Sequence, residues 1–452
     1  MNNRFKYSRT LSHRDKVGNP DELHFTQWHM LGLMGIGFLL PYIGTIGKVL
    51  GYAILILVGL LFFDILIKKK QSSARFFFLL GFIIGGEAFF RDYVMRGFVG
   101  YMVVEYLLIG LGLLSLDPIL KKSSRIPKSM IPWLIFSLWS GFSLLYSQSI
   151  AKGRWFFVIY LSGLFTILMC SAFSKQGSKR DFLYGIAGGV SLAFGTTLYN
   201  EILNPQNIER FGHSFLSAVQ VGIFLTVGLL ALVLLIIQYK KKFISFIFPI
   251  IAFSIGAVLT FSRGPVFGFI LILPFLFLGS SKFTSKIKFL LFFVLLIGSL
   301  YLFVSTNYQE SFIERYTELE LDSGRVNIWA RSVDLWQKKP VLGWGVGSWA
   351  IIYPHTNYLA VSDAHNFFFQ ILVETGLIGA IFVIIFLLST LVSIIKRRNF
   401  IDLGILAYIV SVGLVENWKI AIYFGLFAII FMRDDMSMSP SENQETYAAS
   451  RF

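Results

Sequence analysis

The stretch SDAHNFFFQILVETGLIGAIFVIIFLLSTLVSIIKRR, residues 362–398, holds the pattern around which the chain is organised. A polar segment with His365 turns directly into an apolar run longer than the about 20 residues needed to cross a bilayer, and basic residues follow. On an ideal helix His365, Gly376 and Gly379 share one sector, because each residue turns the helix by about 100°. The histidine is then either a reactive group at a membrane surface or a polar helix start above a glycine packing face.

The composition extends the membrane prediction to the whole chain. Of 452 residues, 55% are hydrophobic and 14% are charged, and the mean hydropathy of +0.69 is too apolar for a soluble protein. Residues 1–27 are polar and basic, and no small-residue cleavage site follows the first apolar run, so we expect an uncleaved membrane protein. The one cysteine, Cys170, excludes an internal disulfide and indicates no thiol chemistry.

Fourteen apolar runs are interpreted as membrane spans. They cover residues 28–47, 49–67, 75–90, 98–116, 130–148, 154–174, 182–200, 213–238, 243–260, 264–280, 286–306, 367–394, 400–416 and 418–432. The pairs at 243–280 and 400–432 are each also compatible with a re-entrant segment. The predicted fold class is an all-α integral membrane protein with about 12–14 transmembrane helices and one large outward loop containing short helices.

Basic residues alternate along the loops and orient the spans. Clusters follow every second span, at Lys68–Lys70, Lys121–Lys128, Lys175–Arg180, Lys240–Lys242, Lys282–Lys288 and Lys396–Arg398. By the positive-inside rule these loops are cytoplasmic, together with residues 1–27 and the polar tail 433–452. The net charge of +15 is therefore a topological signal and does not indicate nucleic-acid binding. The segment 307–366 then faces outward, between a bundle at 28–306 and C-terminal spans at 367–432.

The outward segment is expected to contain an amphipathic helix from Gly324 to Lys338. Its apolar stripe is predicted to comprise Val326, Trp329, Val333 and Trp336. A flexible turn at 343–347 follows. We expect the helix to lie over the membrane or the bundle like a lid.

Several arginines lie on the predicted outward side, where the positive-inside rule does not expect basic residues, so they are candidates for a structural or functional role. The sharpest case is Arg263, between two apolar runs. A charge near membrane depth costs about 2.5–3.5 kcal/mol on insertion scales, so it is paired or functional. A guanidinium suits phosphate binding, and the alternative is a structural pair with Glu87 or Glu416. The same choice is open for Arg154 and Arg210, whereas the following are interpreted as solvated or interfacial: Arg91, Arg96 and Arg331.

Missing motifs narrow the chemistry. The sequence has no Asp-x-Asp pair, no glycine-rich nucleotide fingerprint and no His, Cys or carboxylate spacing typical of a metal site, so we predict no metal and no cofactor. An outward site of arginines and one histidine suits an anionic substrate within the membrane, such as a lipid-linked diphosphate. Histidine, whose unperturbed pKa is near neutrality, suits a general base that activates a hydroxyl.

Three local patterns resemble the O-antigen ligase/polymerase family of bacterial polysaccharide assembly. They are Ser323-Gly324-Arg325 followed by Pro340–Gly345, Ala364-His365-Asn366 followed by Gly376 and Gly379, and Ser262-Arg263-Gly264 at a helix break. The resemblance covers roughly residues 205–395. A family segment that continues from arginine to Gly and Pro-Asn is matched only in part, because the chain reads Arg210-Phe211-Gly212-His213-Ser214.

The resemblance implies transfer of a glycan from undecaprenyl diphosphate to a sugar hydroxyl, without nucleotide or metal. It implies that His365 is the base and that Arg263 and Arg325 bind the donor diphosphate. Arg210 and Arg154 complete the predicted diphosphate set, and packing roles at the site are predicted for Asn366, Gly376 and Gly379. The expected location is the bacterial inner membrane, with the site facing the periplasm or exterior.

The acceptor distinguishes two enzymes of this family. A ligase passes the glycan to a lipid A core, and a polymerase passes it to another carrier-linked repeat unit. The spacing from His365 and Asn366 to the glycine pair favours the ligase. A lipid-linked glycan flippase or another transporter is the alternative from a different class, although no pair of related halves is evident.

Overall fold

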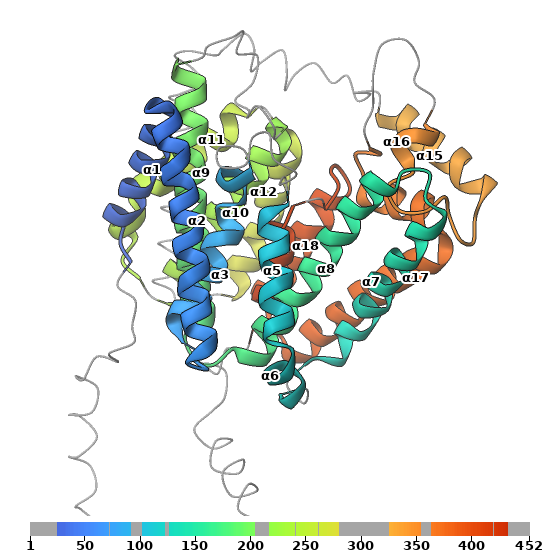
Figure 1. The fold of residues 1–452 in the computed structure, drawn as a ribbon, viewed down its shortest axis with the longest axis horizontal. Helices are drawn as coiled ribbons and strands as arrows, with labels where there is room; N and C mark the ends of the chain where they lie inside the picture. The colour runs from blue at the N-terminus through green and yellow to red at the C-terminus, as the bar shows by residue number, and fades with distance from the viewer. Residues whose placement is uncertain are drawn as a thin grey trace, which may run out of the picture.

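The computed structural model describes residues 25–71, 73–91, 102–122, 126–203 (backbone only from 200), 217–239, 241–260, 262–279, 325–353, 363–418 and 420–432. In these residues all regular structure is helical, and the long helices lie side by side in a bundle (Figure 1). The predicted all-α membrane fold is confirmed.

Six helical segments of the described residues are long and apolar enough to cross a membrane. They are α2 (Gly44–Ile67), α7 (Ile131–Ser143) with its flanking turns η4 (Lys128–Met130) and η5 (Leu144–Tyr146), α8 (Ile150–Phe173), α9 (Ser178–Leu203), α10 (Ala218–Ile237) and α17 (Phe367–Arg397). The shorter apolar helices are α3 (Ala74–Gly85), α5 (Val103–Leu114), α11 (Ile247–Leu259) after η6 (Phe243–Phe246), α12 (Arg263–Gly279), α18 (Phe400–Gly413) and α19 (Ile422–Phe431).

The remaining described helices are α1 (Gln27–Tyr42), α4 (Glu87–Phe89), α6 (Leu116–Lys121), α15 (Arg325–Lys338) and α16 (Trp349–Ile352). Each expected span contains a helix, except 286–306, which lies outside the described residues. The long apolar runs therefore predicted the positions of the helices well.

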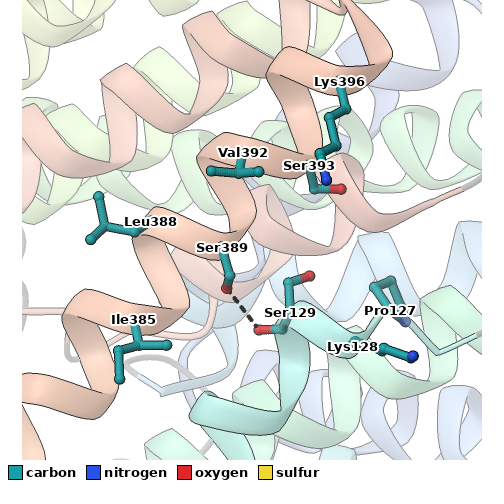
Figure 2. Close-up of a pocket in the computed structure, with 9 residues that line it drawn as sticks. All are labelled: Pro127, Lys128, Ser129, Ile385, Leu388, Ser389, Val392, Ser393 and Lys396. Atoms are coloured by element: carbon teal, nitrogen blue, oxygen red, sulfur yellow. Dashed lines mark hydrogen bonds between the residues drawn. The ribbon is translucent and has the colours of Figure 1, made fainter.

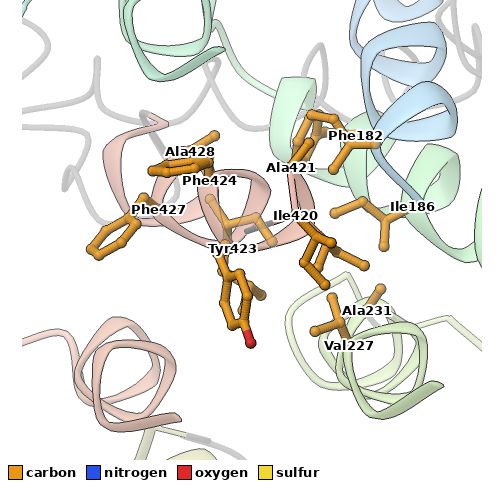
Figure 3. Close-up of a cluster of buried hydrophobic side chains, with 14 of the residues drawn as sticks. Phe182, Ile186, Val227, Ala231, Ile420, Ala421, Tyr423, Phe424, Phe427 and Ala428 are labelled. Carbon is orange, nitrogen blue, oxygen red and sulfur yellow. The ribbon is translucent and has the colours of Figure 1, made fainter. Parts of the chain in front are cut away.

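α19 packs chiefly against α8 and α18, and its buried side chains form an apolar cluster with side chains of α9 and α10 (Figure 3). Its buried side chains include Phe182 and Ile186 of α9, Val227 and Ala231 of α10, and Phe424 of α19. The apolar stretch of α10 is buried throughout, as expected for a helix that is hydrophobic on every side. The structure thus places α10 and α19 inside and leaves the apolar surfaces of α2 and α17 for lipid.

Glycines allow α9 to pack backbone-to-backbone with its neighbours. Gly185 and Gly189 face the carbonyls of Phe78 and Phe82 in α3, and Gly195 faces that of Met34 in α1. A Cβ at any of these glycines would collide with the neighbouring backbone. Close approach through small residues is a common way to pack membrane helices, because lipid supplies no hydrophobic drive between them.

A buried cluster of charges lies between α4, α5 and α19, and it corrects the interpretation of Arg91. The Arg91 guanidinium is 3.0 Å from Glu87 and also bonds Glu105, and both carboxylates are fully buried. Glu87 also accepts a hydrogen bond of 2.6 Å from the Ala421 backbone N–H, at the start of α19. Arg91 is therefore not solvated or interfacial, and Glu87 is bound to Arg91 rather than to Arg263.

The helix expected over 324–338 is present as α15, but its buried face differs from the prediction. The buried residues are Ile328, Ser332 and Leu335. Trp329 and Trp336 of the predicted stripe pack, partly buried, against this cluster, whereas Val326 is 54% exposed. Ser332 accepts a hydrogen bond of 3.2 Å from the indole N–H of Trp349 in α16. The hydroxyl is buried because it has a partner on α16, which the hydrophobic pattern alone does not encode.

Candidate functional site

His365 lies just before α17 and not on it. Asn366 is the N-cap: its side-chain oxygen accepts hydrogen bonds from the backbone N–H groups of Phe368 at 2.9 Å and Phe369 at 3.1 Å. His365 itself has φ of 47°, in the left-handed region that is uncommon for residues other than glycine. The prediction that His365 shares a helical face with Gly376 and Gly379 is therefore wrong, because the asparagine cap starts the helix one residue later.

Two buried carboxylates flank the His365 imidazole. Its Nδ1 is 3.4 Å from Asp363 Oδ1 and 3.8 Å from Glu416 Oε2. The carboxylates are 4% and 2% exposed, whereas the histidine side chain is 35% exposed. The Asp363 carboxylate also accepts a hydrogen bond of 3.0 Å from the His365 backbone N–H. The imidazole thus reaches the surface while the anions that stabilise its protonated form stay covered.

The loop between α18 and α19, residues 414–418, joins the parts of this site. The Leu414 carbonyl accepts a 2.9 Å hydrogen bond from Asn366, and Glu416 faces His365. Val415 lies against Gly264, at the helix break beside Arg263. Trp418 stacks on Phe367 with ring centroids 3.9 Å apart. One loop therefore contacts the histidine segment, the first turn of α17 and the first turn of α12.

A chain of buried hydrogen bonds holds the backbone before His365. Gln370 accepts from the Ala364 N–H at 2.9 Å and donates to Glu374 at 2.6 Å. Glu374 also accepts from the backbone N–H of Trp349 at 3.2 Å. The carbonyl of Ala364 accepts from the Trp329 indole of α15 at 3.2 Å. These bonds tie α15 and α16 to the histidine segment and support its unusual backbone conformation.

The glycines predicted to pack at the site meet other partners. Gly376 interrupts α17 with φ of 64° and ψ of −167°, where a Cβ would collide with Val341. The break exposes backbone groups that bond the 340–345 loop, including Leu377 N–H to Pro340 at 2.9 Å and Trp344 N–H to Val373 at 3.0 Å. Gly379 faces Thr375 of its own helix and the indole of Trp139 in α7.

The predicted arginines are distributed unevenly around the cluster. Arg263 begins α12 and is exposed, beside the contact of Gly264 with Val415. Arg325 begins α15, one turn before Trp329, whose indole reaches Ala364. Arg154 is exposed near the start of α8, and no hydrogen bond or ion pair among the described residues joins it to the cluster. Arg210, like Arg96 and His355, lies outside the described residues.

The same three side chains form a possible metal-ligand set. One ligand atom each from Asp363, His365 and Glu416 lie within 4.8 Å of one another. A catalytic zinc uses three such ligands, but carboxylates beside a histidine equally serve to orient and stabilise an imidazolium. The geometry by itself admits both chemistries.

Sequence reasoning missed the loop 414–418 as part of the site. The sequence indicates Glu416 only as an alternative partner of Arg263 and assigns no role to Asn417, whose amide lies 3.5 Å from Gln370. The available signal was that a carboxylate and an amide separate two apolar runs, where polar groups are costly.

Comparison with known protein families finds a matching family model, and the matched region contains several residues of the candidate site. Residues 248–384 match the family model described as O-antigen ligase. The match includes Arg263, Arg325 and His365 but ends before Glu416. No curated protein matches the chain. The match supports an O-antigen ligase/polymerase-type region, a family whose members are glycosyltransferase-type enzymes, and the apolar helices support a multi-pass membrane protein.

Proposed function

We propose that this protein transfers a glycan from undecaprenyl diphosphate to an acceptor sugar hydroxyl at the outer face of the bacterial inner membrane. The observation that carries the proposal is the partly exposed His365 between two buried carboxylates, inside the region that matches the family. The acceptor that we favour is a lipid A core, which makes the protein an O-antigen ligase; a polymerase that uses the same donor is the alternative.

In the proposed reaction His365 acts as the general base. We place the imidazole proton on Nδ1, which faces Asp363 and Glu416, so that Nε2 accepts the proton of the acceptor hydroxyl. The hydroxyl oxygen bonds to the anomeric carbon as the bond to the diphosphate oxygen breaks, and the electron pair leaves with the diphosphate. A single displacement inverts the anomeric configuration. The two carboxylates stabilise the imidazolium that forms.

The arginines supply the charge that the leaving diphosphate needs. Arg263 begins α12, next to the contact of Gly264 with Val415 in the 414–418 loop. Arg325 begins α15, one turn before Trp329, whose indole donates to the Ala364 carbonyl. One guanidinium group can donate two parallel hydrogen bonds to the oxygens of a phosphate. Its positive charge then stabilises the leaving diphosphate in the way that a metal ion would. Arg210 and Arg154 remain candidates for the same set. The proposed mechanism needs no metal.

A reconstituted assay tests the reaction class. It combines the purified protein, a glycan on undecaprenyl diphosphate and a soluble acceptor core in the presence of EDTA. We expect a new glycosidic bond of inverted configuration. A protein that only moves the donor across a vesicle membrane would contradict the proposal and support a flippase, and loss of transfer with EDTA would contradict metal independence.

The polysaccharides of a deletion strain separate the two acceptors. A missing ligase leaves long glycan chains on the lipid carrier, whereas a missing polymerase leaves single capped units. We expect long carrier-linked chains on a polysaccharide gel.

Replacing Glu416 with glutamine is expected to lower kcat by up to the about 10²–10⁴-fold that general base catalysis supplies. The amide no longer stabilises the imidazolium that forms when His365 takes the acceptor proton. Asp117→Asn, which removes an exposed carboxylate paired with Lys121, is the control and should leave kcat unchanged. A wild-type kcat in Glu416→Gln, measured in the reconstituted assay, would contradict the pairing.

Replacing Arg263 with lysine is expected to lower kcat/KM about 10- to 100-fold, since a hydrogen bond to a charged group contributes about 1.5–3 kcal/mol. Lysine keeps the charge but cannot form the planar two-pronged contact with a diphosphate. Arg331→Lys is the matched control, because Arg331 pairs with Asp334 on the exposed side of α15. Transfer rates with purified donor check the prediction, and equal rates in Arg263→Lys and wild type would argue against a diphosphate contact.

A further inference from the structure

A cavity of about 580 Å³ lies between the C-terminal part of α17 and the turn η4 that precedes α7 (Figure 2). It is lined by Pro127, Lys128, Ser129, Ile385, Leu388, Ser389, Val392, Ser393 and Lys396. The histidine segment precedes α17, whereas the lining residues of α17 begin at Ile385, beyond the break at Gly376. The cavity is therefore separate from the candidate glycosyltransferase site.

The lining divides into a polar end and an apolar wall. Lys128, Lys396 and three serines supply ammonium and hydroxyl groups, and no carboxylate lines the cavity. In the middle, Ser389 of α17 donates a hydrogen bond to the Ser129 carbonyl at 3.4 Å and so links the two sides (Figure 2). The remaining lining is proline and three aliphatic side chains. This combination suits an amphiphile with an anionic head.

The two lysines differ from their neighbours in having no carboxylate. On the side of the basic loops, Lys68 pairs with Asp64, Lys121 with Asp117, and the buried Lys179 with Asp402. No ion pair joins Lys128 or Lys396 to any other residue that the structure describes. Lys128 and Lys396 therefore line one cavity without a carboxylate from the described residues, which gives the lining a positive charge.

The apolar wall continues as a surface that faces lipid. Ile385, Leu388 and Val392 are 44%, 54% and 50% exposed, and with Ile381 they recur at helical spacing on one side of α17. Below the polar end, this stripe runs along the helix toward the membrane centre. An acyl chain can lie along it while its head group stays at the lysines.

We propose that this cavity binds an anionic phospholipid of the cytoplasmic leaflet, with the phosphate between Lys128 and Lys396 and an acyl chain along the α17 stripe. The leaflet follows from the basic loops, which the positive-inside rule places in the cytoplasm. Basic pockets between transmembrane helices on that side are suited to anionic head groups. Charge complementarity favours this occupant over a zwitterionic lipid, because the cation of a zwitterionic head group offsets its phosphate and would meet the two lysines.

Native mass spectrometry of the full-length protein in a neutral detergent tests the proposal, with phosphatidylglycerol and phosphatidylcholine titrated separately. We expect adducts of phosphatidylglycerol at lower lipid concentration than those of phosphatidylcholine. The variant Lys128→Gln/Lys396→Gln should bind phosphatidylglycerol about 30-fold more weakly, from about fivefold for each lysine. Both positions are at the surface, so the variant is expected to fold.

The matched control is Lys69→Gln/Lys70→Gln, which removes two exposed lysines at the end of α2 on the same side, away from the cavity. It should bind phosphatidylglycerol like the wild type. Equal weakening in both double variants, equal affinity for the two lipids, or a dimer that forms in place of lipid adducts would each overturn the proposal.

Discussion

Replacing His365 with alanine is expected to abolish glycan transfer while the protein remains folded in the membrane. General base catalysis contributes about 10²–10⁴-fold, and alanine removes the group proposed to take the proton of the weakly acidic acceptor hydroxyl. The imidazole is 35% exposed and belongs to no part of the apolar core, so its loss should leave the bundle intact. Transfer in the reconstituted assay, normalised to folded protein, measures the effect.

A second variant separates chemistry from backbone strain. His365 has a positive φ, which asparagine also tolerates, so His365→Asn keeps the local conformation but removes the base. We expect this variant to be as inactive as alanine, and added imidazole to restore part of the activity of His365→Ala. His29→Ala, at the exposed start of α1, is the control histidine and should transfer normally. Activity near wild type in His365→Asn would remove His365 from the mechanism.

Replacing Arg91 with methionine is expected to cause the largest loss of stability. The variant leaves two fully buried carboxylates, Glu87 and Glu105, without their cation. Breaking a buried ion pair by removing one partner lowers the free energy of unfolding by about 3–5 kcal/mol. Glu87 also bonds the Ala421 N–H where α19 begins, so the damage should extend into the core. Thermal unfolding in detergent should show a clearly lowered Tm.

A variant that removes all three buried charges tests whether the unpaired carboxylates cause the loss of stability. Changing Glu87 and Glu105 to glutamine together with Arg91→Met removes every charge, and stability should recover in part. Arg331→Met provides the exposed control, since a surface substitution stays within about 0.5 kcal/mol of the wild type. An equal Tm in Arg91→Met and wild type, or no recovery in the triple variant, would show that the buried charges do not couple as proposed.

The residues of the candidate site that could be predicted are those marked by their immediate sequence neighbours. His365 and Arg263 stood out because a polar residue beside a long apolar run is costly unless it has a partner or a function. Asn366 was identified next to the histidine, and it caps α17 with its side-chain oxygen. The helical-face argument failed at that residue, because a capping side chain competes with continuation of the helix.

The partners of the site were not predictable in the same way. Asp363 is two residues from His365, but Glu416 reaches it only because α18 returns the chain and the 414–418 loop packs on the start of α17. The sequence position of Arg91 predicts an interfacial side chain, but the residue is buried. It pairs there with Glu87 of α4 and Glu105 of α5, and these partners are brought together only by helix packing. Such contacts depend on which helices pack together, which no single segment encodes.

The sequence by itself determined the all-α membrane class, the positions of the helices and the charge asymmetry of the loops. These properties follow from the length of apolar runs and the cost of charge in lipid, and both act on each segment alone. Only the tertiary structure decided that Glu416 lies beside His365, that the Gly376 break receives the 340–345 loop, and that Lys128 and Lys396 line one cavity. Those pairings join segments distant in the chain, and their free energy arises only when close packing brings the helices together.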